Sequence, residues 1–324
     1  MPRAGESPAD LHPQVCIVGP GALGCLHAAL LSRAGVPVSL LDHRPDRADL
    51  INRRGLIVED QDGSAVVPVR CSAVPSELPR PDLLILCVKT FQTAEAAAHA
   101  APLVGGSTVV LRIQNGLGSP DCLLGLAPPE RILLGTSGHG ANTVAWGHLR
   151  RAGTGPTRLG PLRPEGLPAA EYAAELLRRA LPDVEVSADV RSVLWHKLFV
   201  NTAINPLTAL TGLRNGQLLA IPLLRAALRD LATEAEHVAI GEGLPFIGGQ
   251  AGVSAEEACR LTAENRSSML QDVHAGRRTE IDDICGAVVR EAQTLGRHAP
   301  LNDVMTWLVA EVLSGKASKA RGPM

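Results

Sequence analysis

The chain has 324 residues, of which 45% are hydrophobic and 20% are charged, and its formal net charge is −2. This length favours two domains with a sizeable core, and the near-neutral charge argues against nucleic acid or an anionic membrane as a partner. No apolar run reaches about 18 residues, so we predict no transmembrane helix.

Seven cysteines are scattered along the chain without a C-x-x-C pair. This pattern favours free, buried thiols in a reducing compartment, so we expect a cytoplasmic protein. The histidines at 43, 139 and 196 are equally scattered, and we interpret them as structural or solvent-facing rather than as metal ligands. Residues 1–12 and 316–324 are expected to be mobile tails.

The first predicted element is a buried strand over the apolar run 15–18, and a glycine motif of the form G-x-G-x-x-G follows it. In such motifs the glycines allow a tight turn, close approach of a pyrophosphate, and close packing of the helix on the strand. We predict that helix over 25–34, with its N-terminal N–H groups facing the phosphates. The motif consists of Gly19, Pro20, Gly21, Ala22, Leu23 and Gly24.

The alternative is a glycine-rich turn between any strand and helix. The context argues against it, because a second apolar strand at 38–41 ends at Asp42, where an acidic group can bind a ribose hydroxyl. Further elements are expected at 47–54 (helix), 56–58 with 65–69 (hairpin), 83–88 (strand), 93–100 (helix) and 108–111 (strand). This alternation predicts a doubly wound, Rossmann-type α/β sheet, with Lys89 and Asn115 beyond the carboxyl ends of strands.

The pattern changes after residue 131, where short strand candidates at 131–135, 148–151 and 157–159 alternate with glycines. A helix at 169–180 and a last strand at 184–186 complete a first domain over 13–188. From 189 to 315 we expect an all-helical domain of six to eight helices. The predicted helices cover 190–204, 218–241 with an interruption near Pro222, 255–264, 280–295 and 301–313, and Asn205-Pro206 is expected to break or kink the first of these.

Three polar residues share one face of the helix at 190–204: Lys197, Asn201 and Asn205 follow one another at intervals of four. Apolar residues flank them, which favours a polar cleft wall over a solvated stripe or over asparagines that satisfy helix ends. Asparagine is a poor helix former, so two of them in one helix need a reason.

The polar segment 264–272 is expected to join two helical stretches, and it offers hydroxyl and amide donors suited to a carboxylate. Glu280 follows, in the first turn of the next predicted helix. The alternative for Glu280 is an ordinary acid that compensates the helix dipole.

Together these motifs resemble the ketopantoate reductase (2-dehydropantoate 2-reductase) family. They occur in the family's order over nearly the whole chain, and the combination is more specific than any one of them. The resembling segments are 19–24, 87–90, 114–118, 195–198, Asn201, 205–209, 215–216, 264–272 and 279–282.

The resemblance implies an oxidoreductase that reduces 2-dehydropantoate to pantoate with NADPH, in the pantothenate and coenzyme A pathway. It implies that Lys197 is the general acid and that Glu280 lies where cofactor and substrate meet. On the cofactor side, Lys89 would reach the ribose and phosphates, and Asn115 and the loop near Ala141 would contact the nicotinamide end. The implied substrate-binding residues are Asn115, Lys197, Asn201, Asn205, Asn215, Asn265 and Ser268.

Lysine suits this chemistry, because a protonated amine can stabilise and protonate the oxygen that gains charge when a ketone accepts hydride. One departure concerns the cofactor: the family usually has an arginine just after the second strand, where this chain reads Leu41-Asp42-His43-Arg44. Asp42 would favour NADH, whereas Arg44 or Arg47 could bind the 2′-phosphate of NADPH. We expect NADP(H) and leave NAD(H) open.

Two other functions fit parts of this pattern. A sister enzyme on the same fold could reduce another branched 2-keto acid with the same lysine and asparagines. A non-catalytic sensor of nicotinamide redox state would bind cofactor tightly without turnover, but it would have no need of Lys197. In each case the expected partner is a small molecule, and the protein is expected to be a monomer or a homodimer.

Overall fold

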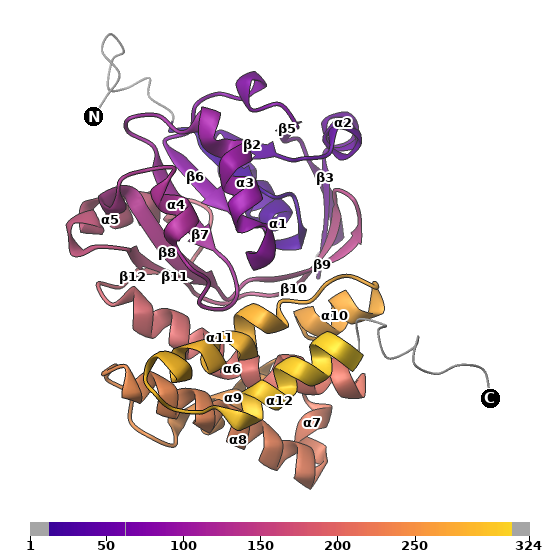
Figure 1. Ribbon diagram of the computed structural model, residues 1–324. Helices are drawn as coiled ribbons and strands as arrows, with labels where there is room; N and C mark the ends of the chain where they lie inside the picture. Colours follow the sequence, from indigo (N-terminus) through magenta and orange to yellow (C-terminus); the bar gives the residue numbers. More distant parts are fainter. Residues whose placement is uncertain (1–12, 62, 313–324) are drawn as a thin grey trace. The chain divides into compact units, whose positions relative to one another are not determined.

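The structure is a computed structural model that describes residues 13–61 and 63–312. The chain divides into two compact units, shown in Figure 1. The Rossmann unit contains the chain up to Gln114 together with Ser119–Val193, and the helical unit contains Asn115–Gly118 and the chain from Leu194. The tails expected at 1–12 and 316–324 lie outside the described residues.

The main sheet of the Rossmann unit confirms the predicted doubly wound fold. Its eight strands run in the order β12-β11-β8-β7-β6-β1-β2-β5, and all neighbours are parallel except β8 and β11. The central strands are buried apolar runs, as expected for strands covered on both faces. The strands are β1 (Val15–Val18), β2 (Val38–Leu41), β5 (Arg70–Ser72), β6 (Leu83–Leu86), β7 (Val109–Ile113), β8 (Ile132–Ser137), β11 (Thr157–Pro161) and β12 (Val184–Val186).

A second, smaller sheet has the order β4-β3-β10-β9. It contains the predicted hairpin, β3 (Leu56–Asp60) with β4 (Gly63–Val67), beside β10 (His148–Gly153) and β9 (Gly140–Ala145). The expectation of a loop near Ala141 was wrong, because this residue lies in β9. The sequence of β9 is Gly-Ala-Asn-Thr-Val-Ala, which lacks the apolar alternation by which a strand is recognised. The short edge strand β5 was not predicted either.

Helix α1 (Ala22–Arg33) packs between the two sheets, against β1 and β2 on one side and β9 and β10 on the other. Most of its residues are therefore buried, and its sequence is apolar almost all round. The predicted start at Cys25 was wrong by three residues, because the helix begins inside the glycine motif. The other helices of this unit are α2 (Pro45–Arg54), α3 (Thr93–Ala100), α4 (Asp121–Leu124) and α5 (Leu167–Arg178).

The chain from residue 190 to residue 312 forms helices without strands, which confirms the predicted all-helical domain. The predicted interruption near Pro222 separates α7 from α8, and a π-helical turn, Leu308–Val312, follows the last α-helix. The helices are α6 (Val190–Thr211), α7 (Gln217–Ala220), α8 (Pro222–Gly241), α9 (Gln250–Leu261), α10 (Ser268–His274), α11 (Ile281–Thr294) and α12 (Pro300–Trp307).

Of the two outcomes expected at Asn205-Pro206, a break was wrong, because α6 continues through Pro206 to Thr211, and a kink stays a prediction. Proline has no N–H, so the carbonyl of Thr202, one turn earlier, loses its helical partner. The thiol of Cys285 on α11 lies 3.8 Å from that carbonyl oxygen and donates to it. Packing of α11 thus offsets part of the cost of the proline.

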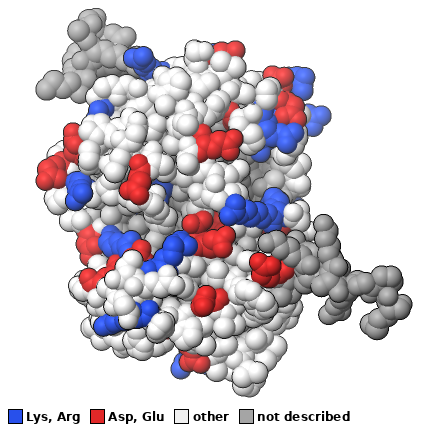
Figure 2. Space-filling view, in the orientation of Figure 1, with Lys and Arg blue, Asp and Glu red and all other residues white. Residues whose placement is uncertain are grey.

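All seven cysteines are free, and five of them are buried. No helix within the described residues is long and apolar enough to cross a bilayer. On the face drawn in Figure 2, acidic and basic side chains are interspersed and form no large single-sign patch. The charge distribution on this face agrees with the small net charge of the sequence.

Candidate functional site

The glycine motif forms a tight turn from β1 into α1. Gly19 has φ +95°, and its N–H donates to the carbonyl of Leu41 at 3.0 Å. A Cβ at Gly24 would lie 2.2 Å from the carbonyl oxygen of Gly19, so a larger residue cannot fit there. A Cβ at Gly21 would meet no protein atom within 4 Å, which leaves open space over the turn. The three glycines therefore provide the turn, the approach and the packing expected of a pyrophosphate site.

The N-terminus of α1 is suited to an anion. Gly21 caps the helix without a side chain, and the first turn contains no acidic residue. The N–H groups of a first helical turn have no partner within the helix, and the helix dipole places partial positive charge there. Ala22 and Leu23 of the motif belong to this first turn.

Asp42, at the end of β2, is buried and already paired. Its carboxylate accepts hydrogen bonds from Nε of Arg47 at 2.5 Å and from Nη2 of Arg47 at 2.6 Å. The backbone N–H groups of His43 and Arg44 donate to its Oδ1. The negative charge of Asp42 is thus compensated by Arg47, which the sequence alone did not reveal.

Arg44 occupies the neighbouring surface. Its guanidinium carbon lies 4.5 Å from the ring centroid of Trp146, which stands in the turn between β9 and β10, and its Nη2 lies 2.8 Å from Oδ2 of Asp46. A cation at this distance from an indole ring is attracted by the negative face of the ring. Both arginines are paired, because Nε and Nη2 of Arg44 donate to Asp46, but the Arg44–Asp46 pair is exposed whereas Arg47 is held by the buried Asp42. Arg44 is therefore the more accessible of the two candidate arginines to a phosphate.

Two further candidates for the cofactor lie in the Rossmann unit. Lys89 precedes the 3-10 turn Thr90–Gln92 that follows β6, and Ala141 on β9 is paired with Arg151 on β10. Lys89 thus lies beyond the carboxyl end of a strand of the main sheet, and Ala141 lies in the smaller sheet. The remaining two candidates, Asn115 and Glu280, belong to the helical unit.

In the helical unit, α6 carries the predicted polar face. Trp195, Leu198 and Phe199 are buried and fix the helix in the core. Lys197 stands between them, and burial lowers the pKa of its ammonium. Within the described part of this unit, no hydrogen bond or ion pair to Lys197 offsets that burial. A partly desolvated, unpaired ammonium is poised to interact with an oxygen that gains negative charge.

The side-chain amide of Asn115 connects Asn201 on α6 to Glu280 at the start of α11. Nδ2 of Asn201 donates to Oδ1 of Asn115 at 3.4 Å, and Nδ2 of Asn115 donates to Oε2 of Glu280 at 3.2 Å. The structure thus brings together three predicted site residues that are far apart in sequence. Glu280 is the N-cap of α11 rather than a first-turn residue, and only 4% of it is exposed, so it is no ordinary surface acid.

Two other predicted residues have buried polar atoms without a partner among the described residues. Nδ2 of Asn205 and Oδ1 of Asn215 make no hydrogen bond, while Nδ2 of Asn215 donates to Oγ1 of Thr262 at 2.9 Å. The backbone of Asn215 also donates to the carbonyl of Asn265 at 3.1 Å, which places these two residues together. A buried polar atom without a partner is costly, so such atoms indicate a bound ligand or water.

The polar segment 264–272 is not a plain connector as expected, because its second half forms α10. Ser267 is the N-cap of α10: its Oγ accepts from the N–H of Leu270 and lies 2.6 Å from Oγ1 of Thr208. Ser267 is buried, whereas Ser268, the predicted ligand, is exposed. The sequence signal for Ser267 was the serine just before an apolar run, which is typical of an N-cap.

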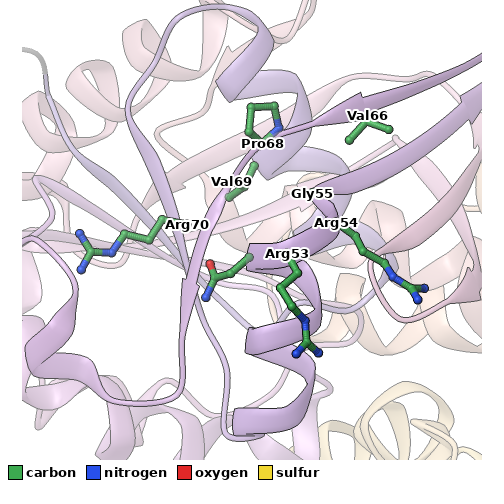
Figure 3. Close-up of a pocket in the computed structure, with 8 residues that line it drawn as sticks. Arg53, Arg54, Gly55, Val66, Pro68, Val69 and Arg70 are labelled. Carbon is green, nitrogen blue, oxygen red and sulfur yellow. The ribbon is translucent and has the colours of Figure 1, made fainter.

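Two features of the Rossmann unit lie outside the predicted site. His27 on α1 and His139 after β8 are buried edge to face, with ring centroids 6.0 Å apart, and burial lowers the pKa of His27 to about 3. A hollow of about 440 Å³ lies between the end of α2 and the strands β4 and β5. Figure 3 shows that its side chains Arg53, Arg54 and Arg70 point away from one another, so they do not form a convergent anion site.

Comparison with known sequences identifies the family of the chain. The family described as ketopantoate reductase PanE/ApbA matches residues 15–164, and its C-terminal counterpart matches residues 189–312. The chain belongs to the ketopantoate reductase family. The 2-dehydropantoate 2-reductase of Archaeoglobus fulgidus is 34% identical over 302 residues, which cover 93% of this chain and 98% of that relative.

Solved structures agree with this assignment. The crystal structure of a PanE/ApbA family ketopantoate reductase from Ralstonia eutropha is 32% identical, with a TM-score of 0.82, and the match covers 94% of this chain and 99% of the other. D-mandelate dehydrogenase, solved with NADH and anilino(oxo)acetate, has a TM-score of 0.88 at 24% identity and covers 94% of this chain and 99% of the other. This second likeness concerns the fold alone.

Proposed function

We propose that this protein reduces 2-dehydropantoate to pantoate with NADPH. The observation that carries the proposal is the polar face of α6, where a desolvated Lys197 precedes Asn201, which Asn115 connects to Glu280. These residues occur in a chain that is similar over nearly its full length to 2-dehydropantoate 2-reductases.

In the proposed reaction, the nicotinamide supplies hydride to the C2 ketone. Lys197 stabilises the negative charge that develops on the ketone oxygen and gives that oxygen a proton. Burial lowers the pKa of Lys197 and so makes the proton easier to release. Glu280 and Asn115 are proposed to orient the groups around the reacting carbon, since the hydrogen bond between them restricts both side chains.

The remaining polar groups of the helical unit are proposed to hold the rest of the keto acid. Nδ2 of Asn205 and Oδ1 of Asn215 are buried without a partner, and a carboxylate or hydroxyl of the substrate would satisfy them. Ser268 is exposed at the first position of α10, where its hydroxyl and the helix N-terminus favour a carboxylate. Asn265, joined to Asn215 through the backbone, completes this set.

The cofactor fits the residues of the Rossmann unit. Gly19–Gly24 would hold the pyrophosphate, with Lys89 on the ribose and phosphate side and Ala141 toward the nicotinamide end. The pairing of Asp42 with Arg47 supports NADPH over NADH, because a compensated carboxylate repels a 2′-phosphate less than a bare one and is less available to ribose hydroxyls. Arg44, held against Trp146, is proposed to bind that phosphate.

One alternative is a reductase of another 2-keto acid that uses NADH. The observation in its favour is that D-mandelate dehydrogenase, solved with NADH, has the same fold. The higher identity to 2-dehydropantoate 2-reductases favours the first proposal.

Steady-state rates test both proposals together. The purified protein is assayed with 2-dehydropantoate, 2-ketoisovalerate and phenylglyoxylate, each with NADPH and with NADH. We expect the highest kcat/KM for 2-dehydropantoate with NADPH. A higher kcat/KM for another acid would make that acid the proposed substrate instead. A preference for NADH would mean that Asp42 binds the ribose hydroxyls and that Arg44 does not bind a 2′-phosphate. Light scattering on the same preparation distinguishes monomer from homodimer.

A further inference from the structure

After β7, two adjacent residues, Gln114 and Asn115, make their side-chain hydrogen bonds to different units of the chain. The amide of Gln114 is fixed in the Rossmann unit, where its Nε2 donates to the carbonyl of Val88 at 2.7 Å and to Oγ1 of Thr93 at 2.9 Å. The amide of Asn115, the next residue, is fixed in the helical unit by Asn201 and Glu280. The loop Asn115–Gly118 therefore belongs to the helical unit, although the chain on both sides belongs to the other.

Gly116 holds this loop against α11. It has φ +77°, and a Cβ placed on it would lie 2.0 Å from the carbonyl oxygen of Asp283 and 2.8 Å from the carbonyl carbon. Asp283 cannot simply turn aside, because its N–H donates to the carbonyl of Glu280 at 3.0 Å within the first turn of the helix. Only glycine allows the loop backbone to approach this turn so closely.

The contact lies on the same helical turn as Glu280. Because Nδ2 of Asn115 donates to Glu280 and Oδ1 accepts from Asn201, the direction of the amide is set, and one N–H of Nδ2 is left for a ligand. A shift of the loop by the width of a methyl group would break both hydrogen bonds, since each is already long at 3.2 and 3.4 Å.

We propose that Gly116, through its backbone contact with Asp283, is a positioning residue for keto-acid reduction. It keeps the Asn115 amide between Asn201 and Glu280 and so completes the site of the helical unit. This inference rests on the proposed function, and it assigns the role to a residue that has no side chain and that touches no substrate. Misplacement of a positioning group by about 1 Å can lower a rate by about 10²-fold.

A positive φ alone would make Gly116 an ordinary turn glycine, and a matched control separates the two roles. Gly296, at the other end of α11, has φ +66°, and a Cβ there would meet nothing within 4 Å. The variants Gly116→Ala and Gly296→Ala therefore share the backbone strain of a positive φ, but only the first forces the loop away from α11.

The experiment compares these two variants with Asn115→Ala and with the double variant Gly116→Ala/Asn115→Ala. We expect Gly296→Ala to lower Tm and to keep kcat/KM for 2-dehydropantoate within about twofold of the wild type. Gly116→Ala should lower kcat/KM by about 10²-fold and should change the Kd of the cofactor far less, because the glycine turn of the Rossmann unit is proposed to hold the pyrophosphate. The double variant should be no worse than Asn115→Ala, because Gly116 acts through that amide. A Gly116→Ala protein with wild-type kcat/KM, or losses that multiply in the double variant, would overturn the inference.

If Gly116→Ala does not fold, the double variant Gly116→Ala/Asp283→Gly is used instead. Glycine at 283 makes the backbone of the first turn of α11 more flexible, so this turn can move away from the added methyl group. This protein should fold and still show the loss in kcat/KM, with Asp283→Gly alone as its control. A wild type that reduces no keto acid would remove the proposed function instead. In that case a crystal structure of Gly116→Ala decides: an intact hydrogen bond between Asn115 and Glu280 overturns the positioning role.

Discussion

The Rossmann unit and the helical unit prepare their candidate sites in different ways. In the Rossmann unit the candidate phosphate site is formed by backbone: a turn with Gly19 at φ +95° and a helix N-terminus capped without a side chain. The acidic side chain at its edge, Asp42, is already compensated by Arg47. In the helical unit the candidate site consists of side chains: burial lowers the pKa of Lys197, and Asn205 and Asn215 each have a buried polar atom without a partner among the described residues.

This difference predicts which property, stability, ligand binding or rate, a substitution in each unit should change. A backbone site fails when its shape changes, so substitutions in the Rossmann unit should act on stability or on cofactor binding. A side-chain site can lose its chemistry while the fold survives, so substitutions in the helical unit should act on the rate and on the keto acid. The following predictions test this division.

The largest effect on the rate is expected from Lys197→Ala. Loss of a general acid lowers a rate by about 10²–10⁴-fold, which corresponds to roughly 2.7–5.5 kcal/mol of barrier. Single-turnover loss of reduced nicotinamide absorbance measures the hydride transfer directly. Lys89→Ala, the other lysine within the described residues, should instead raise the KM of the cofactor. A folded Lys197→Ala protein with a near wild-type transfer rate would falsify the assignment.

The largest effect on stability is expected from Arg47→Ala. This change leaves the buried carboxylate of Asp42 without its partner, which typically costs about 3–5 kcal/mol. Urea unfolding gives the free energy. Arg44→Ala, at an exposed ion pair, should hardly change stability but should raise the KM of NADPH. The opposite pattern, with Arg47 important for NADPH binding and not for stability, would contradict the roles given to the two arginines.

Gly24→Ala and Gly21→Ala should separate packing from ligand approach. The methyl group at 24 collides with the carbonyl of Gly19, and such overpacking typically costs about 1–3 kcal/mol. The methyl group at 21 meets open space, so Tm should be kept while the Kd of the cofactor rises. Thermal unfolding and quenching of protein fluorescence measure the two effects. Equal loss of Tm in both variants would count against the open approach at Gly21.

The two adjacent serines should behave differently. Ser268→Ala removes a proposed hydrogen bond to a charged carboxylate, worth about 1.5–3 kcal/mol, and should weaken keto-acid binding by about tenfold or more at unchanged Tm. Ser267→Ala removes an N-cap and should cost about 1 kcal/mol of stability instead. Substrate Kd is measured with oxidised cofactor bound. An unchanged Kd for Ser268→Ala would argue against the proposed carboxylate site.

The deprotonation of Lys197 is expected to change the reduction rate least at neutral pH and more at high pH. Lys197 must be protonated to act as an acid, and burial lowers its pKa, so the reduction rate should fall as pH rises through a value below the ordinary lysine pKa of about 10.4. Lys197→Arg should be slow but should show no such fall, because arginine stays protonated. The pH profile of single-turnover rates gives the comparison. A wild-type profile that stays flat up to pH 10.4 would contradict the lowered pKa.

Local signals explain what could be predicted from the sequence. The glycine motif, the apolar central strands and the face of α6 depend on residues within one or two turns of each other, so spacing alone indicates them. The pairing of particular side chains gave no such signal, whether the partners are near or far apart in the sequence. Nothing in the segment around Asp42 indicates that Arg47 would occupy it, and Asn115 meets Glu280 across a separation of 165 residues.

The errors have the same cause. Pro206 was expected to break or kink α6, and the helix is not broken there, because α11 supplies a donor for the carbonyl that the proline leaves without one. The strand β9 has a weak sequence pattern and is formed because β10 pairs with it. Ser267 was missed rather than mispredicted: the resemblance to a family pointed to Ser268, which stays a prediction, and the structure adds Ser267 and its bond to Thr208.

The loop Asn115–Gly118 also constrains how the gene can be recombined. The second family match begins at residue 189, so a chimaera that joined this chain's first part to a relative's helical half there would combine Asn115 and Gly116 with a foreign counterpart of α11. The carbonyl of Asp283 and the loop that rests on it would then come from different parents. Exchange of the helical half between relatives therefore has to carry residues 115–118 along, and a fragment that starts at 189 lacks one member of its own site.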